Sequence, residues 1–141
     1  MFLTFNYTLK FIDNKGKTMT DFNQLSPLAL AFMGDAIHTA YVRKCVLSGT
    51  INKMNNYHNA ARKFCNAQKQ KESLEKIIDI LTDEEKDVVR KARNTHSKHS
   101  AKNFDEETYK KATAFEALLG WLYLNEKHER LNEFLKLSMQ D

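Results

Sequence analysis

Residues 26–49 read SPLALAFMGDAIHTAYVRKCVLSG, and this stretch decides the class of fold. Ser26 is a favourable N-cap residue, and Pro27 stands at the first helical position, where its missing N–H costs nothing. Apolar residues then recur at helical spacing until Ser48 and Gly49, a pair typical of a helix end. The recurring apolar residues are Leu30, Met33, Ile37, Tyr41 and Cys45. The stretch therefore predicts one long helix with a face in the protein core.

Helical patterns continue towards the C-terminus. Thr82 and Glu85 fit a capping box, in which each residue satisfies a backbone N–H of the other, and they predict a helix start. Asp105 is the N-cap expected for a strongly apolar helix. The expected elements are one long or two consecutive helices over about 52–81, single helices over about 82–94, 105–122 and 127–137, and a polar, basic loop over 94–104.

The composition agrees with an all-α domain. The chain has 141 residues, 42% of them hydrophobic, but only one Pro and four Gly, too few for the many turns of a β-sandwich or β-barrel. We expect five to seven helices in one domain over residues 19–141. Residues 1–18, MFLTFNYTLKFIDNKGKT, alternate like a strand, and we expect a short extra strand or an upstream extension that the domain does not need.

The charge distribution favours a polyanionic partner. The chain carries 22 Lys and Arg against 18 Asp and Glu, a net charge of +4. Residues 36–71 and 90–102 each contain several cations and no acid. One such run is usually a solvated helix face, but two of them in a short chain favour binding to nucleic acid.

Two carboxylates stand at unusual positions. Asp35 and Glu116 each lie in the middle of an apolar helical segment, where we expect little access to water. A buried carboxylate needs a partner, because an unpaired buried charge is costly. The residues alone leave two alternatives open, an ordinary buried ion pair or a magnesium ion held by one carboxylate from each helix.

The same two segments resemble the ribonuclease III family. Residues 30–36, LAFMGDA, resemble the signature helix of its catalytic domain, E-x-x-E-F-L-G-D followed by Ala or Ser. Residues 114–124, AFEALLGWLYL, resemble the second motif, which begins D-x-x-E-A-L. Between them, residues 91–94, KARN, are similar to the R-G-R-N stretch of Mini-ribonuclease III, the short branch without a double-stranded-RNA-binding domain.

The resemblance implies an all-α ribonuclease III-type endonuclease domain that works as a homodimer. It implies that Asp35 and Glu116 are catalytic and hold Mg²⁺, and that the substrate is double-stranded RNA, with maturation of the large-subunit (23S) ribosomal RNA precursor as the physiological reaction. Phe32 matches an aromatic residue that packs across the dimer axis, and Met33 adds apolar surface beside it. The RNA-binding residues expected at the end of one helix and in the basic loop are Arg90, Arg93, Asn94, Lys98 and Lys102.

Two departures from the family pattern keep an alternative open. Full-length ribonuclease III has further acids at the positions of Ala31 and Thr113, whereas the Mini branch resembles this chain in lacking them. Their absence favours a second hypothesis, a catalytically inactive RNA-binding or ribosome-associated scaffold. A third, a small-molecule phosphohydrolase, lacks its expected His and Asp clusters. His38 follows Asp35 by one turn, and we expect a packing role for it more often than a role in the site.

The remaining features concern the cellular compartment in which the protein is located. Cys45 and Cys65 form no C-x-x-C pair, a usage typical of reduced thiols. No apolar run approaches the roughly 20 residues that span a bilayer. We therefore expect a cytoplasmic protein with no membrane contact.

Overall fold

The computed structural model describes residues 22, 24–49, 54–95 and 105–140. Within these residues the chain forms six α-helices and one short 3-10 helix, with no β-strand, which confirms the all-α prediction and the expected number of helices. The elements are α1 (Pro27–Leu47), α2 (Met54–Arg62), α3 (Ala67–Ile77), η1 (Ile78–Ile80), α4 (Asp83–Arg93), α5 (Glu106–Leu124) and α6 (His128–Ser138). The expected extension over residues 1–18 lies outside the described residues.

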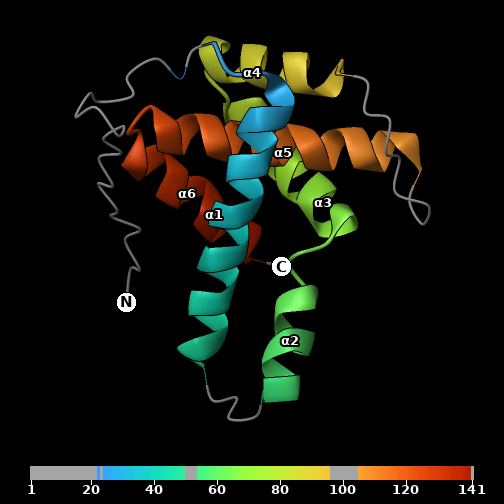
Figure 1. Ribbon diagram of the computed structural model, residues 1–141, viewed down its shortest axis with the longest axis vertical. Coiled ribbons are helices and arrows are strands. Elements are labelled where there is room, and N and C mark those ends of the chain that lie inside the picture. Colours follow the sequence, from blue (N-terminus) through green and yellow to red (C-terminus); the bar gives the residue numbers. More distant parts are fainter. Residues whose placement is uncertain (1–21, 23, 50–53, 96–104, 141) are drawn as a thin grey trace, which may run out of the picture.

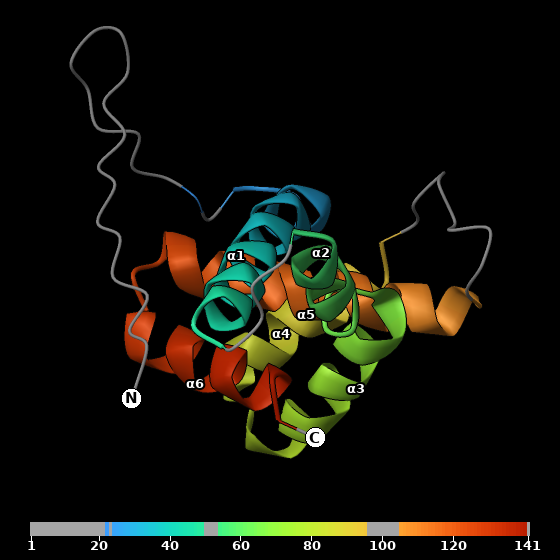
Figure 2. The same cartoon turned by 90° about the horizontal axis from the view of Figure 1, so that it is seen from below.

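Helix α5 is the centre of the fold. Helix α1 crosses one side of it, and α3, α4 and α6 lie on the other side, as Figures 1 and 2 show. Because neighbours cover both sides, α5 is apolar almost all round, and Phe115, Leu118 and Leu122 are completely buried. The most apolar segment of the sequence therefore forms the middle of the core.

Side-chain caps start three of the helices where the sequence predicts them. Ser26 Oγ accepts a hydrogen bond of 3.1 Å from the Ala29 N–H, and Asp105 Oδ1 accepts one of 2.7 Å from the Thr108 N–H. Thr82 and Glu85 form the predicted capping box. The region over about 52–81 contains two α-helices, because α2 ends at Arg62 and Asn66 caps the start of α3.

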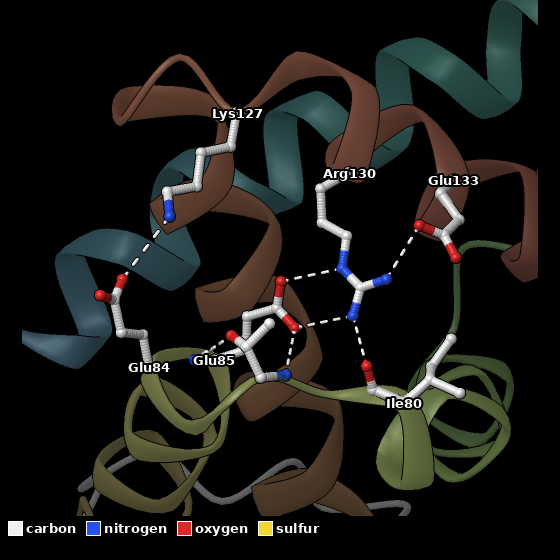
Figure 3. A network of polar contacts seen from close by, with 7 residues as sticks. Ile80, Glu84, Glu85, Lys127, Arg130 and Glu133 are labelled. Atoms are coloured by element: carbon white, nitrogen blue, oxygen red, sulfur yellow. Dashed lines mark hydrogen bonds and ion pairs between the residues drawn. The ribbon is translucent and has the colours of Figure 1, made fainter.

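The capping box is joined to α6 by a network of polar contacts (Figure 3). Arg130 of α6 donates to both oxygens of Glu85, at 2.9 Å each, and also to Glu133 and the carbonyl oxygen of Ile80. The Thr82 N–H donates to Glu85 Oε2 at 2.8 Å. Burial alone would raise the pKa of Glu85, but these donors outweigh burial and hold its pKa below the ordinary value. Each oxygen of the buried Glu85 carboxylate thus accepts at least one hydrogen bond.

Two further observations concern exposure. Ile78 is exposed because the chain turns into η1 at that residue, while Leu81 beyond it is buried. Among the helices that the structure describes, none combines the length and the apolar character required to cross a membrane.

Candidate active site

Two glycines bring α1 and α5 into backbone contact. A Cβ atom on Gly34 would overlap the carbonyl oxygen of Glu116, and a Cβ atom on Gly120 would overlap the carbonyl oxygen of Leu30. Only glycine permits such an approach, because every other residue carries a Cβ. The close approach of the two backbones thus explains why each motif has a glycine at this position. The crossing places Asp35, the residue after Gly34, beside Glu116.

The two carboxylates differ in their exposure. Glu116 is partly buried, but Asp35 is exposed. The expectation that Asp35 has little access to water is wrong for the single chain. The core face of α1 passes through Leu30, Gly34, Ile37 and Tyr41, so Asp35 lies on a side of the helix that the domain leaves open.

The pair has an excess of negative charge. Burial, and after it the charge of Asp35, raises the pKa of Glu116 to about 8, although a hydrogen bond from Gln70 opposes this rise. Within the described part of the chain neither carboxylate forms an ion pair, in contrast to Glu85 with Arg130. The alternative of an ordinary buried ion pair is therefore wrong for the described residues. A cation is the group that would compensate this charge.

The donor set is small. Among the described residues no group of three or more His, Cys, Asp or Glu side chains gathers to form a metal centre. Ala31 and Thr113, at the positions of the additional family acids, are buried. Asp35 and Glu116 thus offer two hard oxygen ligands, which suits magnesium, an ion that keeps several waters and takes few protein ligands.

Gln70 of α3 is a residue of this site that the sequence argument missed. Its Nε2 donates to Glu116 Oε1 at 2.8 Å and lies 3.4 Å from His38 Nδ1. The sequence contained an indication of this role. Gln70 lies one turn before Leu74 on the helix face that also carries Ile77, so its position belongs to the buried face of α3. A glutamine at a core position requires a buried partner.

His38 has the packing role that we expected. It is 1% exposed, its ring packs edge-on against Phe115 with centroids 5.4 Å apart, and burial lowers its pKa to about 4. His38 is also connected to the site through Gln70, because its Nδ1 faces the Gln70 amide that donates to Glu116. Its Nε2 has no hydrogen-bond partner within the described residues.

Cys65 is a second residue that the sequence argument did not assign to the site. Burial raises the pKa of this thiol, its hydrogen bond with the Thr39 side chain opposes the rise, and the charges of Asp35 and Glu116 raise the pKa further. Cys65 therefore lies close enough to the two carboxylates to be affected by their charge. The positive charge of Arg43 acts on the same thiol.

The residues predicted to bind RNA lie at the end of α4. Arg90 pairs with Asp87 at 2.6 Å, and Arg93 pairs with Glu107 at 3.1 Å. Together with Asn94 the two arginines line a surface pocket of about 400 Å³, to which Lys86 and Lys110 also contribute. Such exposed ion pairs contribute little energy and leave the arginines available to phosphate. Lys98 and Lys102 lie outside the described residues.

Phe32 and Met33, the two residues predicted to lie in the dimer interface, differ in exposure. Phe32 is 83% exposed, whereas Met33 is only partly exposed and packs against the core. A phenylalanine with this exposure is unusual for a side chain of its size and apolar character. It lies on the open side of α1, one turn before Asp35.

Comparisons with known proteins agree with this geometry. The model of the ribonuclease III domain family matches residues 28–127, which include both carboxylates. The Mini-ribonuclease 3 of Thermoanaerobacter sp. (strain X514) is 44% identical over 116 residues, covering 82% of each chain. That of Staphylococcus aureus (strain NCTC 8325 / PS 47) is 41% identical over 113 residues, covering 79% of this chain and 84% of that protein.

A solved structure shows the same fold. An X-ray crystal structure of a protein from Fusobacterium nucleatum superposes with a TM-score of 0.75 at 31% sequence identity, and the match covers 84% of this chain and 94% of that chain. The chain is an endoribonuclease of the ribonuclease III type. It has the all-helical fold, the two carboxylates at the crossing of α1 and α5, and the family match over most of its length. The chain belongs to the ribonuclease III family, in its Mini-ribonuclease III branch.

Proposed function

We propose that this endoribonuclease cleaves double-stranded RNA with the help of magnesium held by Asp35 and Glu116. The observation that carries the proposal is that two carboxylates from separate helices meet at the α1–α5 crossing, and that no described cation compensates them. A carboxylate with a purely structural role looks different in this fold, as Glu85 shows with its two bonds from Arg130.

The two carboxylates contribute in different ways. Glu116 is anchored in the domain by the bond from Gln70, so its position is fixed by α5 and α3 together. Asp35 is exposed and faces the solvent from which a substrate arrives. When bound, magnesium supplies the Lewis acidity for attack of water on a phosphodiester, which leaves a 5′-phosphate and a 3′-hydroxyl.

We further propose that the enzyme works as a homodimer through the open side of α1. Phe32 is 83% exposed, and Leu25 and Leu28 are 39% and 40% exposed. Leu28 and Phe32 are four residues apart, so their side chains share one face of α1, and Leu25 lies just before the helix begins. Pairing two such faces buries apolar surface, and it supplies two sites for the two strands of a duplex.

RNA contacts in this proposal come from two places. The first is the end of α4 with the loop beyond it, through Arg90, Arg93, Asn94, Lys98 and Lys102. The second is α1 itself. Arg43 is exposed, it forms no ion pair with a described residue, and it follows Asp35 by eight residues, so it lies on the same open side of α1, about 12 Å further along the helix and roughly 80° around its axis. Both places suit the phosphates of a duplex that passes over the carboxylates.

The physiological substrate that we propose is the 23S ribosomal RNA precursor, on the strength of the Mini-ribonuclease III resemblance. Its processing would take place in the cytoplasm, and the free thiols Cys45 and Cys65 suit a reducing compartment. The test is to compare cleavage of precursor duplex with cleavage of an unrelated duplex of equal length. Equal rates and random positions of cleavage would contradict this choice of substrate.

The competing candidate is an inactive RNA-binding scaffold, which Ala31 and Thr113 favour because the family places acids there. The two functions are separated by incubating the purified chain with long duplex RNA, with and without magnesium. We expect cleavage only with magnesium, and we expect Asp35→Asn and Glu116→Gln to abolish it while the helical circular dichroism spectrum is retained. Duplex binding without cleavage at any magnesium concentration would establish the scaffold instead.

A further inference from the structure

One amide group connects three helices beneath the carboxylate pair. Gln70 lies in the first turn of α3 and is 6% exposed. Its Nε2 donates to Glu116 Oε1 on α5 at 2.8 Å, and the same nitrogen lies 3.4 Å from His38 Nδ1 on α1. The two helices that supply the carboxylates are therefore linked through a third helix.

The donors and acceptors in this chain of contacts match when Glu116 is ionised, as it would be when it holds a metal ion. An amide nitrogen carries two hydrogens, and an ionised carboxylate can only accept. Nδ1 of a neutral imidazole is an acceptor when the hydrogen is on Nε2. The neutral state agrees with the burial of His38. With Glu116 ionised and the His38 hydrogen on Nε2, the amide nitrogen can donate to both groups, whereas rotation of the amide by 180° would place its oxygen against two acceptors.

We propose that Gln70 is a positioning residue of the catalytic site, which holds one oxygen of Glu116 and so orients the other oxygen towards the metal ion shared with Asp35. His38 orients Gln70 in turn. This inference rests on the proposed function, because it assigns Gln70 a role towards the metal that Glu116 would bind. Partners that hold a metal ligand in this way affect metal affinity although they never touch the ion.

A merely structural role makes a different prediction. If Gln70 only satisfied the hydrogen-bonding needs of a buried region, its replacement would lower stability and leave metal affinity unchanged. Gln70→Met separates the two roles, because methionine has nearly the same length and volume but no hydrogen-bond donor. Gln68→Met is the matched control, since Gln68 is on the same helix but is exposed and donates to Glu72 at 3.0 Å.

The experiment uses Mn²⁺ alone as the probe of the full, metal-free chain. Electron paramagnetic resonance of free Mn²⁺ gives the affinity without any RNA, and thermal unfolding gives the stability of each variant. We expect Gln70→Met to weaken Mn²⁺ binding by about 10- to 100-fold, the range typical for partners of metal ligands, and Gln68→Met to leave it unchanged. With duplex RNA, the half-activating Mg²⁺ concentration should rise by a similar factor, and saturating Mg²⁺ should restore most of the rate.

The His38 variants keep the test decisive should Gln70→Met fold poorly. His38→Asn retains an acceptor near the position of Nδ1 and should bind Mn²⁺ almost as the wild type does, whereas His38→Leu should bind it more weakly. The double variant His38→Leu with Gln70→Met should bind Mn²⁺ no more weakly than Gln70→Met alone, because both substitutions act through Glu116.

The outcomes separate this inference from the proposed function. Wild-type affinity for Mn²⁺ in Gln70→Met, or in His38→Leu, would overturn the positioning role and leave the metal site standing. A wild-type chain that binds no Mn²⁺ and cleaves no duplex would overturn the proposed function itself, and the positioning role with it.

Discussion

The backbone of Gly34 lies against the carbonyl oxygen of Glu116, with no room for a Cβ atom between the two helices. The separation of the backbones that carry Asp35 and Glu116 is therefore determined by a backbone contact rather than by flexible side chains. A rigid packed crossing holds functional groups more accurately than a loop does. The glycine is thus part of the site although it has no chemistry of its own.

Gly34→Ala should separate α1 from α5. Because the added methyl group meets backbone and not a flexible side chain, we expect a loss of about 3 kcal/mol or more in the free energy of unfolding, measured by urea denaturation. Cleavage should fall as well, since the carboxylates move apart. Gly49→Ala is the control, because its Cβ would lie 3.4 Å from the Val46 carbonyl oxygen, an ordinary contact. Equal stability of both variants would contradict the steric argument.

Glu116 should make the metal-free protein less stable as the pH rises. Its pKa is raised from 4.5 to about 8 in the folded chain, first by burial and then by Asp35, so the folded state retains a proton that the unfolded state has released. The stabilisation is complete below about pH 4.5 and is lost as the pH rises to about 8. We expect a decline of the order of a few kcal/mol, since one pKa unit corresponds to about 1.4 kcal/mol.

The Glu116→Gln variant isolates this effect from other titrating groups. Its free energy of unfolding should lack the decline, so the difference between wild type and variant should change between about pH 5 and pH 8. Added Mg²⁺ should stabilise the wild type most at the alkaline end, where the carboxylate is ionised. A difference that stays constant across this range would argue against a raised pKa.

Phe32→Asp should convert the proposed dimer into monomers. The substitution puts a charge where the proposal requires an apolar contact, and α1 has no reason to unfold because Phe32 touches little of its own domain. Analytical ultracentrifugation at micromolar concentration measures the change. Leu47→Asp, at another exposed apolar position of α1, should leave the dimer intact. A monomeric wild type would refute the proposal.

Arg93→Ala should weaken binding to different RNA duplexes about equally, because phosphate contacts carry no sequence information. The slope of log affinity against log salt should fall by roughly one unit if one phosphate contact is lost. Lys98→Ala should behave in the same way. Glu107→Gln removes the partner that Arg93 has in the free protein, at 3.1 Å, and should therefore maintain or increase affinity. Weaker binding in Glu107→Gln would point to a structural role for the pair.

Deletion of residues 1–18 should leave folding, dimerisation and cleavage unchanged. The match to the ribonuclease III family model begins only at residue 28, and the first described helix begins at Pro27. Circular dichroism, sedimentation and duplex cleavage of the shortened chain test this expectation. A loss of folding would show instead that apolar residues such as Phe2, Phe5 or Phe11 belong to the core.

The starts of α1, α4 and α5 could be predicted from the sequence. Ser26, Thr82 and Asp105 each accept a hydrogen bond from the N–H group three residues further on, and such local effects can be predicted without knowledge of the fold. The sequence leaves open whether residues 52–81 form one helix or two, and the structure shows the two helices α2 and α3. Asp35 and Glu116 could also be selected from the sequence, since acids are conspicuous within apolar segments.

Only the tertiary structure decided how those acids are surrounded. The exposure of Asp35 depends on which side of α1 the core covers, and the contact of Gln70 with Glu116 joins residues 46 positions apart. The partner of Glu85 is likewise 45 positions away. Such contacts depend on how the helices pack, and helical periodicity indicates which residues share a face but not which helix that face meets.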